Sequence, residues 1–168
     1  MRITARQVFV GPSQYAHYPV LRLELDLGML EQWPTGRLGP AFVDALVAAV
    51  PELAQHGCSY KEPGGLIRRM KEDEGTWLGH VLEHVAIELQ NMAGEDVTFG
   101  RTRSIDGRPG VYSVVYEYAQ REEGIEAGEL ALKLLSSLLP EELKSERAVS
   151  ADWSWPAARD AFIRFAQK

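Results

Sequence analysis

The residues best suited to chemistry lie in one short segment, His80-Val81-Leu82-Glu83-His84. Two histidines four positions apart share one side of a helix, so both imidazoles can reach one point beside it. Neutral imidazole is a common zinc ligand, and zinc lowers the pKa of a bound water toward about 7. Glu83 is placed to take a proton from that water as a general base. The order H-x-x-E-H is the inverted-zincin pattern, and it predicts a zinc hydrolase.

The same pattern also fits two surface histidines beside a solvated glutamate, because three fixed positions can occur by chance. A helical wheel over residues 76–93 places His80, Glu83 and His84 on the side opposite the apolar stripe. Two of the four histidines of the chain share this one turn. Both features favour metal binding over the surface interpretation. The apolar stripe consists of Leu78, Val81, Leu82, Val85, Leu89 and Met92.

A zinc site needs a third protein ligand. Glu88 continues the spacing of the two histidines, but it lies about 12 Å from His80 along the helix axis, too far to share one ion. We therefore assign Glu88 to a supporting position from which it orients His84. Glu117 is the preferred third ligand, because it ends an otherwise apolar and aromatic strand. A plain sheet-edge role for Glu117 stays open, and the alternative ligands are Glu122, Glu123 and Glu126 at the start of the next helix.

Three further residues are candidates for substrate contacts. Arg101 and Arg103 alternate on one face of a strand, where they either bind carboxylates in a bidentate manner or simply face solvent. Ser59 lies in a glycine-rich loop that could line a cleft. We expect the glycines of this loop to serve the backbone.

The remaining cysteine and histidines carry no motif. Cys58 has no motif partner near it in sequence, so we predict a structural role for it and not a nucleophilic one. His17 and His56 are predicted to be ordinary surface or loop histidines.

The elements that must position these residues follow an α+β pattern. Two strands, two helices, two strands and a helix predict an antiparallel sheet of about four strands with helices packed on one face. Residues 1–140 are predicted to form one domain, followed by a charged segment and a short tail helix in 141–168. The predicted strands are 3–10, 19–27, 97–103 and 111–118, and the predicted helices are 41–56 (divided at Pro51), 76–93 (with Thr76 as N-cap and Gly94 after its end) and 122–138.

The composition bounds the class of protein. A chain of 168 residues, 45% hydrophobic and 25% charged, suits one compact globular domain. The net charge of −6 argues against a nucleic-acid-binding protein, which usually presents a basic face. With a single cysteine, no membrane-length apolar segment and no secretory signal, we expect a cytoplasmic protein. Phosphate-binding glycine motifs are absent, so nucleotide binding is not expected.

Several segments resemble the N-terminal domain of cyanophycin synthetases. They are GPSQYAHYPVLRLELDLG near the start, GTWLGHVLEHVAIELQNMAG in the centre, and VTFGRTR followed by GVYSVVYEY, and the resemblance extends over residues 1–140. The product of this family, cyanophycin, is a bacterial nitrogen reserve with a poly-aspartate backbone and an arginine joined to each side chain. Full-length synthetases add an ATP-grasp domain and a Mur-ligase-like domain, which perform the two ligations and are not in this sequence.

The resemblance implies two roles for such a domain. One is a metallopeptidase-like site, similar to that of pitrilysin-like inverted zincins, which cuts cyanophycin into short primers. It places zinc on His80 and His84 and makes Glu83 the base, while Arg101 and Arg103 bind carboxylates of the polymer. The other role is to hold the polymer near the ligase sites without a metal. A third possibility is an assembly domain that docks onto ligase domains or forms homo-oligomers.

Overall fold

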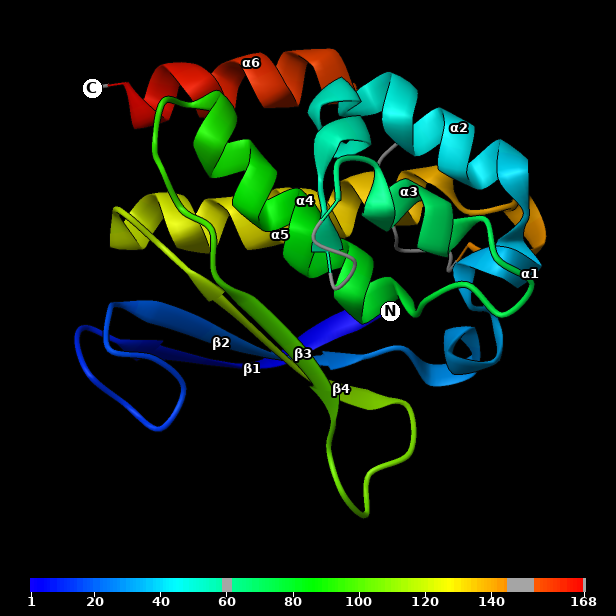
Figure 1. Ribbon diagram of the computed structural model, residues 1–168, viewed down its shortest axis with the longest axis horizontal. Helices are drawn as coiled ribbons and strands as arrows, with labels where there is room; N and C mark the ends of the chain where they lie inside the picture. The colour runs from blue at the N-terminus through cyan, green and yellow to red at the C-terminus, as the bar shows by residue number, and fades with distance from the viewer. Residues whose placement is uncertain (59–61, 145–152, 168) are drawn as a thin grey trace.

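The computed structural model describes residues 1–58, 62–144 and 153–167. Four strands form one antiparallel sheet in the order β1-β2-β4-β3, and the helices lie on one side of it (Figure 1). The predicted α+β class, with helices on one face of an antiparallel sheet, is therefore confirmed. The strands are β1 (Arg2–Phe9), β2 (Val20–Asp26), β3 (Gly100–Ser104) and β4 (Val111–Glu117).

Two long helices, α4 and α5, pack against each other, and several shorter helices accompany them. The central α4 packs against α5 and against β3 and β4, so it lies directly on the sheet. The helices are α1 (Thr35–Leu38), α2 (Pro40–Ala49), α3 (Gly65–Met70), α4 (Leu78–Met92), α5 (Arg121–Leu138) and α6 (Trp155–Ala166), with short 3-10 turns η1 (Gly28–Gln32), η2 (Pro51–Gln55) and η4 (Glu141–Leu143).

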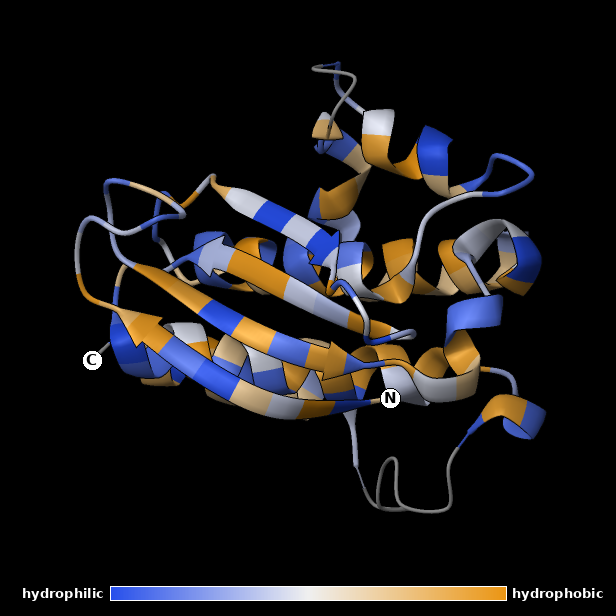
Figure 2. Ribbon diagram, turned by 90° about the horizontal axis from the view of Figure 1, so that it is seen from below, coloured by the Kyte–Doolittle hydropathy of each residue, from blue (hydrophilic) through white to orange (hydrophobic). Residues whose placement is uncertain are grey.

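The sheet separates a buried face from an open one. Leu21, Leu23 and Leu25 of β2 are at most 1% exposed and face the helices. Arg22 and Glu24, at the intervening positions, form an ion pair on the other face. Figure 2, which views the sheet from its open side, shows this alternation of hydrophobic and hydrophilic residues along the strands. The strand predicted at 19–27 is thus confirmed, with one face in the core.

Helix α4 is covered on more sides than its amphipathic sequence suggests. Its predicted apolar stripe is buried, but Glu83 and Glu88 on the opposite side are also only 4% and 7% exposed. Residues 56–58, which follow η2, line one cavity together with this second side. The side of α4 that carries the motif therefore lines a recessed cavity and is not a flat solvent-exposed helix face.

The start of α4 differs from the sequence prediction. Trp77 occupies the N-cap position, and no side chain caps the helix there. The Thr76 hydroxyl instead lies 2.9 Å from Nδ1 of His80. At the other end, Gly94 follows the C-cap with a φ of 106°, as predicted for a residue in the left-handed region.

Strand β3 begins three residues later than predicted. The amide of Asn91 binds both the N–H and the carbonyl of Val97. The carboxylate of Glu117 accepts hydrogen bonds from the N–H groups of Thr98 and Phe99. Side chains therefore satisfy this stretch of backbone, and the regular ladder with β4 starts only at Gly100.

Two other sequence predictions have clear outcomes. The division of the 41–56 helix at Pro51 is confirmed, since α2 ends at Ala49 and η2 begins at Pro51. The tail helix is also confirmed, and α6 packs against α4 and α5 with Phe162 only 3% exposed. The indole N–H of Trp155 donates to the carbonyl of Ala49 at 2.9 Å. None of the described helices combines the length and apolar character of a membrane span.

Candidate metal centre

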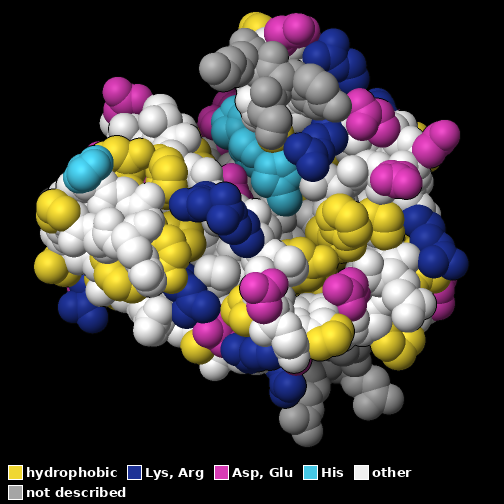
Figure 3. All heavy atoms as spheres, turned by 60° about the horizontal axis from the view of Figure 1, so that its bottom comes forward, with side chains coloured by type: hydrophobic (Ala, Val, Ile, Leu, Met, Phe, Trp, Pro, Cys, Tyr) yellow, Lys and Arg dark blue, Asp and Glu magenta, His cyan; other side chains and the backbone are white. Residues whose placement is uncertain are grey.

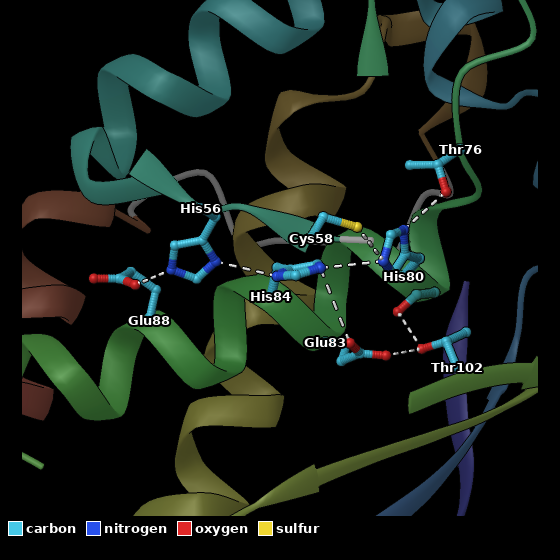
Figure 4. Close-up of polar contacts among 9 residues, drawn as sticks. His56, Cys58, Thr76, His80, Glu83, His84, Glu88 and Thr102 are labelled. Carbon is cyan, nitrogen blue, oxygen red and sulfur yellow. Dashed lines mark hydrogen bonds and ion pairs between the residues drawn. The ribbon is translucent and has the colours of Figure 1, made fainter. Parts of the chain in front are cut away.

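Three side chains bring possible metal ligands together beside α4: Cys58, His80 and His84 (Figure 4). The Nε2 atoms of His80 and His84 are 3.1 Å apart, and the sulfur of Cys58 lies 3.4 Å from Nε2 of His80. All three ligand atoms lie within 4.8 Å of one another. In the part of the chain that the structure describes, this is the one such group of three. One thiol and two imidazoles are a donor set that suits zinc and leaves a fourth position for water or substrate.

Two separate elements build this group. The two histidines occupy successive turns of α4, as their spacing predicts, and both rings point to the same side. Cys58 comes from the chain just after η2 and has a φ of 50°. A left-handed conformation is uncommon for a residue other than glycine. The backbone therefore turns sharply at the position from which the sulfur reaches the histidines.

Both histidines are held in the form that binds metals. Burial, together with the smaller effect of the positive charge of Arg69, lowers the pKa of His80 to about 4. Burial likewise lowers the pKa of His84. Both rings are therefore neutral at pH 7, as metal ligation requires. A metal on Nε2 of His80 needs the ring proton on Nδ1, and the Thr76 oxygen lies 2.9 Å from Nδ1, where it can accept a hydrogen bond from that N–H.

The carboxylate of Glu83 lies beside the group. One of its oxygens is 4.0 Å from Nε2 of His84, and the other accepts a hydrogen bond of 2.6 Å from the hydroxyl of Thr102 on β3. The backbone of Gly100 packs against this carboxylate so closely that a Cβ there would overlap it. A helix side chain and an edge strand thus fix the carboxylate in one place.

Burial also tunes the basicity of Glu83. It raises the pKa of this carboxyl to about 7, although the Thr102 hydrogen bond acts in the opposite direction. The neighbouring Cys58 also contributes to the raised pKa. A carboxylate whose pKa lies near the working pH can both accept a proton and return it. A strongly shifted carboxyl inside a cavity is also typical of functional sites.

Two cavities meet at this position. One, of about 470 Å³, is lined by all three members of the group and by Glu83 and His56. The other, of about 650 Å³, shares His80, Glu83 and Gly100 with the first and extends along β3. Figure 3 shows histidine side chains at the bottom of a hollow on this face, with Lys or Arg side chains beside it. The group is therefore reachable from outside.

The predicted third ligand, Glu117, lies outside this group. Its carboxylate accepts the N–H groups of Thr98 and Phe99 at 3.1 and 3.2 Å. The alternatives Glu122, Glu123 and Glu126 do not join the group either. The structure brings Cys58 into the group in their place, although the sequence alone predicts only a structural role for this residue. Cys58 was missed because it lies 22 residues before His80 and belongs to no ligand-spacing motif. The one signal available in the sequence was that it is the sole cysteine.

Glu88 reaches His84 only through another residue. Its carboxylate pairs with Nε2 of His56, whose Nδ1 lies 3.1 Å from Nδ1 of His84. The sequence alone predicts an ordinary surface or loop histidine at position 56. The His56 side chain is instead only 18% exposed and lines the cavity. No spacing in the sequence links His56 to α4, so only the folded chain reveals this contact.

The predicted substrate contacts lie on and near β3. Arg101 and Arg103 line the second cavity together with His80 and Glu83. Both also border a hollow of about 360 Å³ on the open face of the sheet. Within the described residues, neither guanidinium takes part in a hydrogen bond or an ion pair. Ser59, the third predicted contact, lies outside the described residues.

Comparison with known proteins identifies the family of this domain. The profile of the family described as "Cyanophycin synthase-like N-terminal domain" matches residues 22–140. The cyanophycin synthetase of Geminocystis herdmanii is 38% identical over 141 residues, which cover 83% of this chain and 16% of that protein. The cyanophycin synthetase of Trichormus variabilis is 36% identical over 180 residues, which cover all of this chain and 20% of that protein. The chain thus spans a fifth or less of the length of these relatives. It belongs to the cyanophycin synthase-like N-terminal domain family.

Proposed function

We propose that this domain is a zinc-dependent hydrolase that cleaves the backbone of cyanophycin into short primers for polymer synthesis. The observation that carries the proposal is the position of Glu83, a buried carboxyl with a pKa of about 7, beside a Cys-His-His group in a cavity. Its family membership provides the substrate class, because the relatives are named cyanophycin synthetases.

Cys58, His80 and His84 would hold the metal through Sγ and the two Nε2 atoms. When bound there, zinc supplies Lewis acidity, which makes a water more acidic and polarises a carbonyl. The thiolate requires a reduced cysteine, so a reducing, cytoplasmic setting is part of the proposal. The fit rests on the donor types and on their mutual distances.

Glu83 would perform the proton transfers. As a base it takes the proton of the water whose oxygen attacks the amide carbonyl of the polymer backbone. As an acid it then gives this proton to the nitrogen that leaves when the C–N bond breaks. The hydrogen bond from Thr102 holds one carboxylate oxygen and leaves the other, 4.0 Å from Nε2 of His84, turned toward the reaction. A pKa near 7 suits both steps.

The arginines of β3 would bind the substrate. Arg101 and Arg103 share a cavity with Glu83, and a guanidinium binds carboxylates in a bidentate manner. Carboxylates of the polymer are their expected partners. Since β3 is an edge strand of the sheet, an extended substrate can approach it along the same cavity. In a longer protein, ATP-grasp and Mur-ligase-like domains would then use the primers.

The decisive experiment compares the wild type with Glu83→Gln, both loaded with zinc, for the release of short fragments from purified cyanophycin. We expect the variant to keep one zinc per chain and to lose cleavage by a factor of about 10² to 10⁴. Glu126→Gln, which makes the same change at an exposed position on α5, is the control and should cleave normally. Equal cleavage by the wild type and Glu83→Gln would refute the mechanism.

A second candidate is a polymer-binding domain that needs no metal. Arg101 and Arg103 favour this polymer-binding role. They lie beside an open hollow on the sheet and form no ion pair within the described residues. This alternative predicts that cyanophycin still binds after treatment with a chelator and that binding weakens in Arg101→Ala and Arg103→Ala. It also predicts no zinc after purification, whereas the hydrolase requires about one per chain.

A further inference from the structure

A line of polar contacts leads away from the Cys-His-His group into the interior (Figure 4). It runs from His84 to His56 and from His56 to Glu88. His84 and Glu88 belong to α4, whereas His56 is the C-cap of η2. Glu88 is 7% exposed and the His56 side chain 18%, so these contacts are largely removed from water. Buried polar groups of this kind need well-defined partners.

The geometry allows one consistent placement of protons if His84 serves the site. Nε2 of His84 faces Nε2 of His80 at 3.1 Å, so a lone pair on that nitrogen points into the group. A neutral imidazole carries one proton, which must then be on Nδ1. Nδ1 of His84 lies 3.1 Å from Nδ1 of His56, whose lone pair accepts a hydrogen bond from this N–H. His56 therefore carries its own proton on Nε2, and this N–H donates a hydrogen bond to the Glu88 carboxylate.

We propose that His56 and Glu88 are positioning residues that hold His84 in the Nδ1–H tautomer, with the Nε2 lone pair directed at the metal. The inference rests on the proposed metal site. Glu88 acts only through His56, since its carboxylate contacts that ring and not His84. Metal-bound histidines commonly donate their second N–H to such a partner, and loss of this partner weakens metal binding by about 10- to 100-fold.

The pair also ties the two elements of the site together. Cys58 follows His56 by two residues, so a fixed His56 restricts where the cysteine can lie. The backbone of His56 is held as well, because its N–H donates to Leu53 and its carbonyl accepts from Leu66. The contact with Glu88 thus anchors the chain that carries Cys58 onto the helix that carries both histidines.

The first test measures the tautomers directly, by long-range ¹H–¹⁵N NMR of the imidazole rings in metal-free protein. We expect the proton of His84 on Nδ1 and that of His56 on Nε2. In His56→Phe, which keeps a ring but removes both nitrogens, His84 should lose its preference for Nδ1–H. A proton on Nε2 of His84 in the wild type would overturn the inference, even if the domain binds no zinc.

The second test measures zinc affinity by competition with a chromophoric chelator. We expect His56→Phe to bind zinc about 10- to 100-fold more weakly and Glu88→Gln to show a smaller loss. The double variant should bind as His56→Phe alone does, because both residues act through one hydrogen-bonded chain. Glu123→Gln is the matched control, since Glu123 is also 7% exposed but lies on α5, and it should bind as the wild type does.

The two proposals fail in different ways. Wild-type affinity in His56→Phe, or additive losses in the double variant, would overturn the positioning role while leaving a zinc hydrolase intact. Absence of zinc binding in the wild type would overturn the proposed function, and the NMR measurement would still decide the tautomer of His84. A purely structural tie between η2 and α4 would lower stability in His56→Phe without changing the zinc affinity of the folded protein.

Discussion

At the residue scale, the burial of Glu83, the proposed general base, has a cost in stability. It is 4% exposed, and burial raises the pKa of its carboxyl to about 7. In the unfolded chain a glutamate has a pKa of about 4.5. The folded protein therefore binds the Glu83 proton more tightly than the unfolded chain does. As the pH rises from about 4.5 to 7, the unfolded chain loses this proton first, so the contribution of Glu83 to stability declines. The cation proposed for this site would offset part of that cost.

This cost predicts that metal-free Glu83→Gln is more stable than the wild type at pH 8. A neutral amide avoids burial of a charge, so we expect a gain on the order of 2–3 kcal/mol in the free energy of unfolding. At pH 4 the wild-type carboxyl is protonated and the gain should vanish. Urea denaturation of both proteins at the two pH values measures this. The same difference at pH 4 and pH 8 would show that the Glu83 carboxyl is not shifted.

The choice between Cys58 and Glu117 as third ligand is also decided at this scale. We expect Cys58→Ser to weaken zinc binding by at least tenfold and to abolish the sulfur-to-metal charge-transfer absorption of the cobalt-substituted protein. Glu117→Gln should retain both properties, because its carboxylate is occupied by the N–H groups of Thr98 and Phe99. The opposite pattern would restore Glu117 as the ligand.

At the element scale, the contact between α4 and β3 determines the geometry of the site. Glu83 comes from the helix, and Thr102 and Gly100 come from the strand. The strand can lie this close because Gly100 has no side chain where the carboxylate packs. An edge strand thus holds the helix side chain that we propose as the general base.

Gly100→Ala should therefore reduce hydrolysis while zinc remains bound. The added methyl group would displace the Glu83 carboxylate or the strand, because the two would overlap. We expect a fall in kcat of at least tenfold with an unchanged zinc content, measured by cleavage assay and elemental analysis. Gly11→Ala is the control, since a Cβ at Gly11 meets no atom within 4 Å. A fully active Gly100→Ala would mean that the carboxylate needs no such fixed position.

At the scale of the whole molecule, the tail helix completes the helical layer. Residues of α6 pack against α4 and α5, so a segment that the sequence set apart from residues 1–140 shares the core of the domain. Phe162 is its main anchor at 3% exposed, whereas Phe165, one turn later, is 47% exposed. The two phenylalanines therefore form a natural pair for comparison.

Phe162→Ala should lower the free energy of unfolding by about 3–5 kcal/mol, the usual cost of emptying a buried phenylalanine position. Phe165→Ala should change it by no more than about 0.5 kcal/mol. Chemical denaturation of both variants tests this. Equal effects would mean that α6 does not dock in solution as it does here. The zinc affinity of the folded protein should be unchanged in both, because α6 supplies no residue of the metal centre.

Local patterns in the sequence were sufficient for much of the fold. The alternation in β2, the break at Pro51 and the position of Gly94 all depend on neighbours in the chain, and the structure confirms each of them. The early start predicted for β3 was wrong, because the side chains of Asn91 and Glu117 take the backbone bonds of that stretch. No local pattern reports such contacts.

The sequence by itself determined that His80, Glu83 and His84 share one side of a helix, because 3.6-residue periodicity is a local property. Only the tertiary structure decided what covers that side. Cys58 and His56 reach it from another element, and Gly100 closes on Glu83 from a strand. Contacts of this kind depend on how the chain packs in three dimensions, and spacing along the chain carries no record of them.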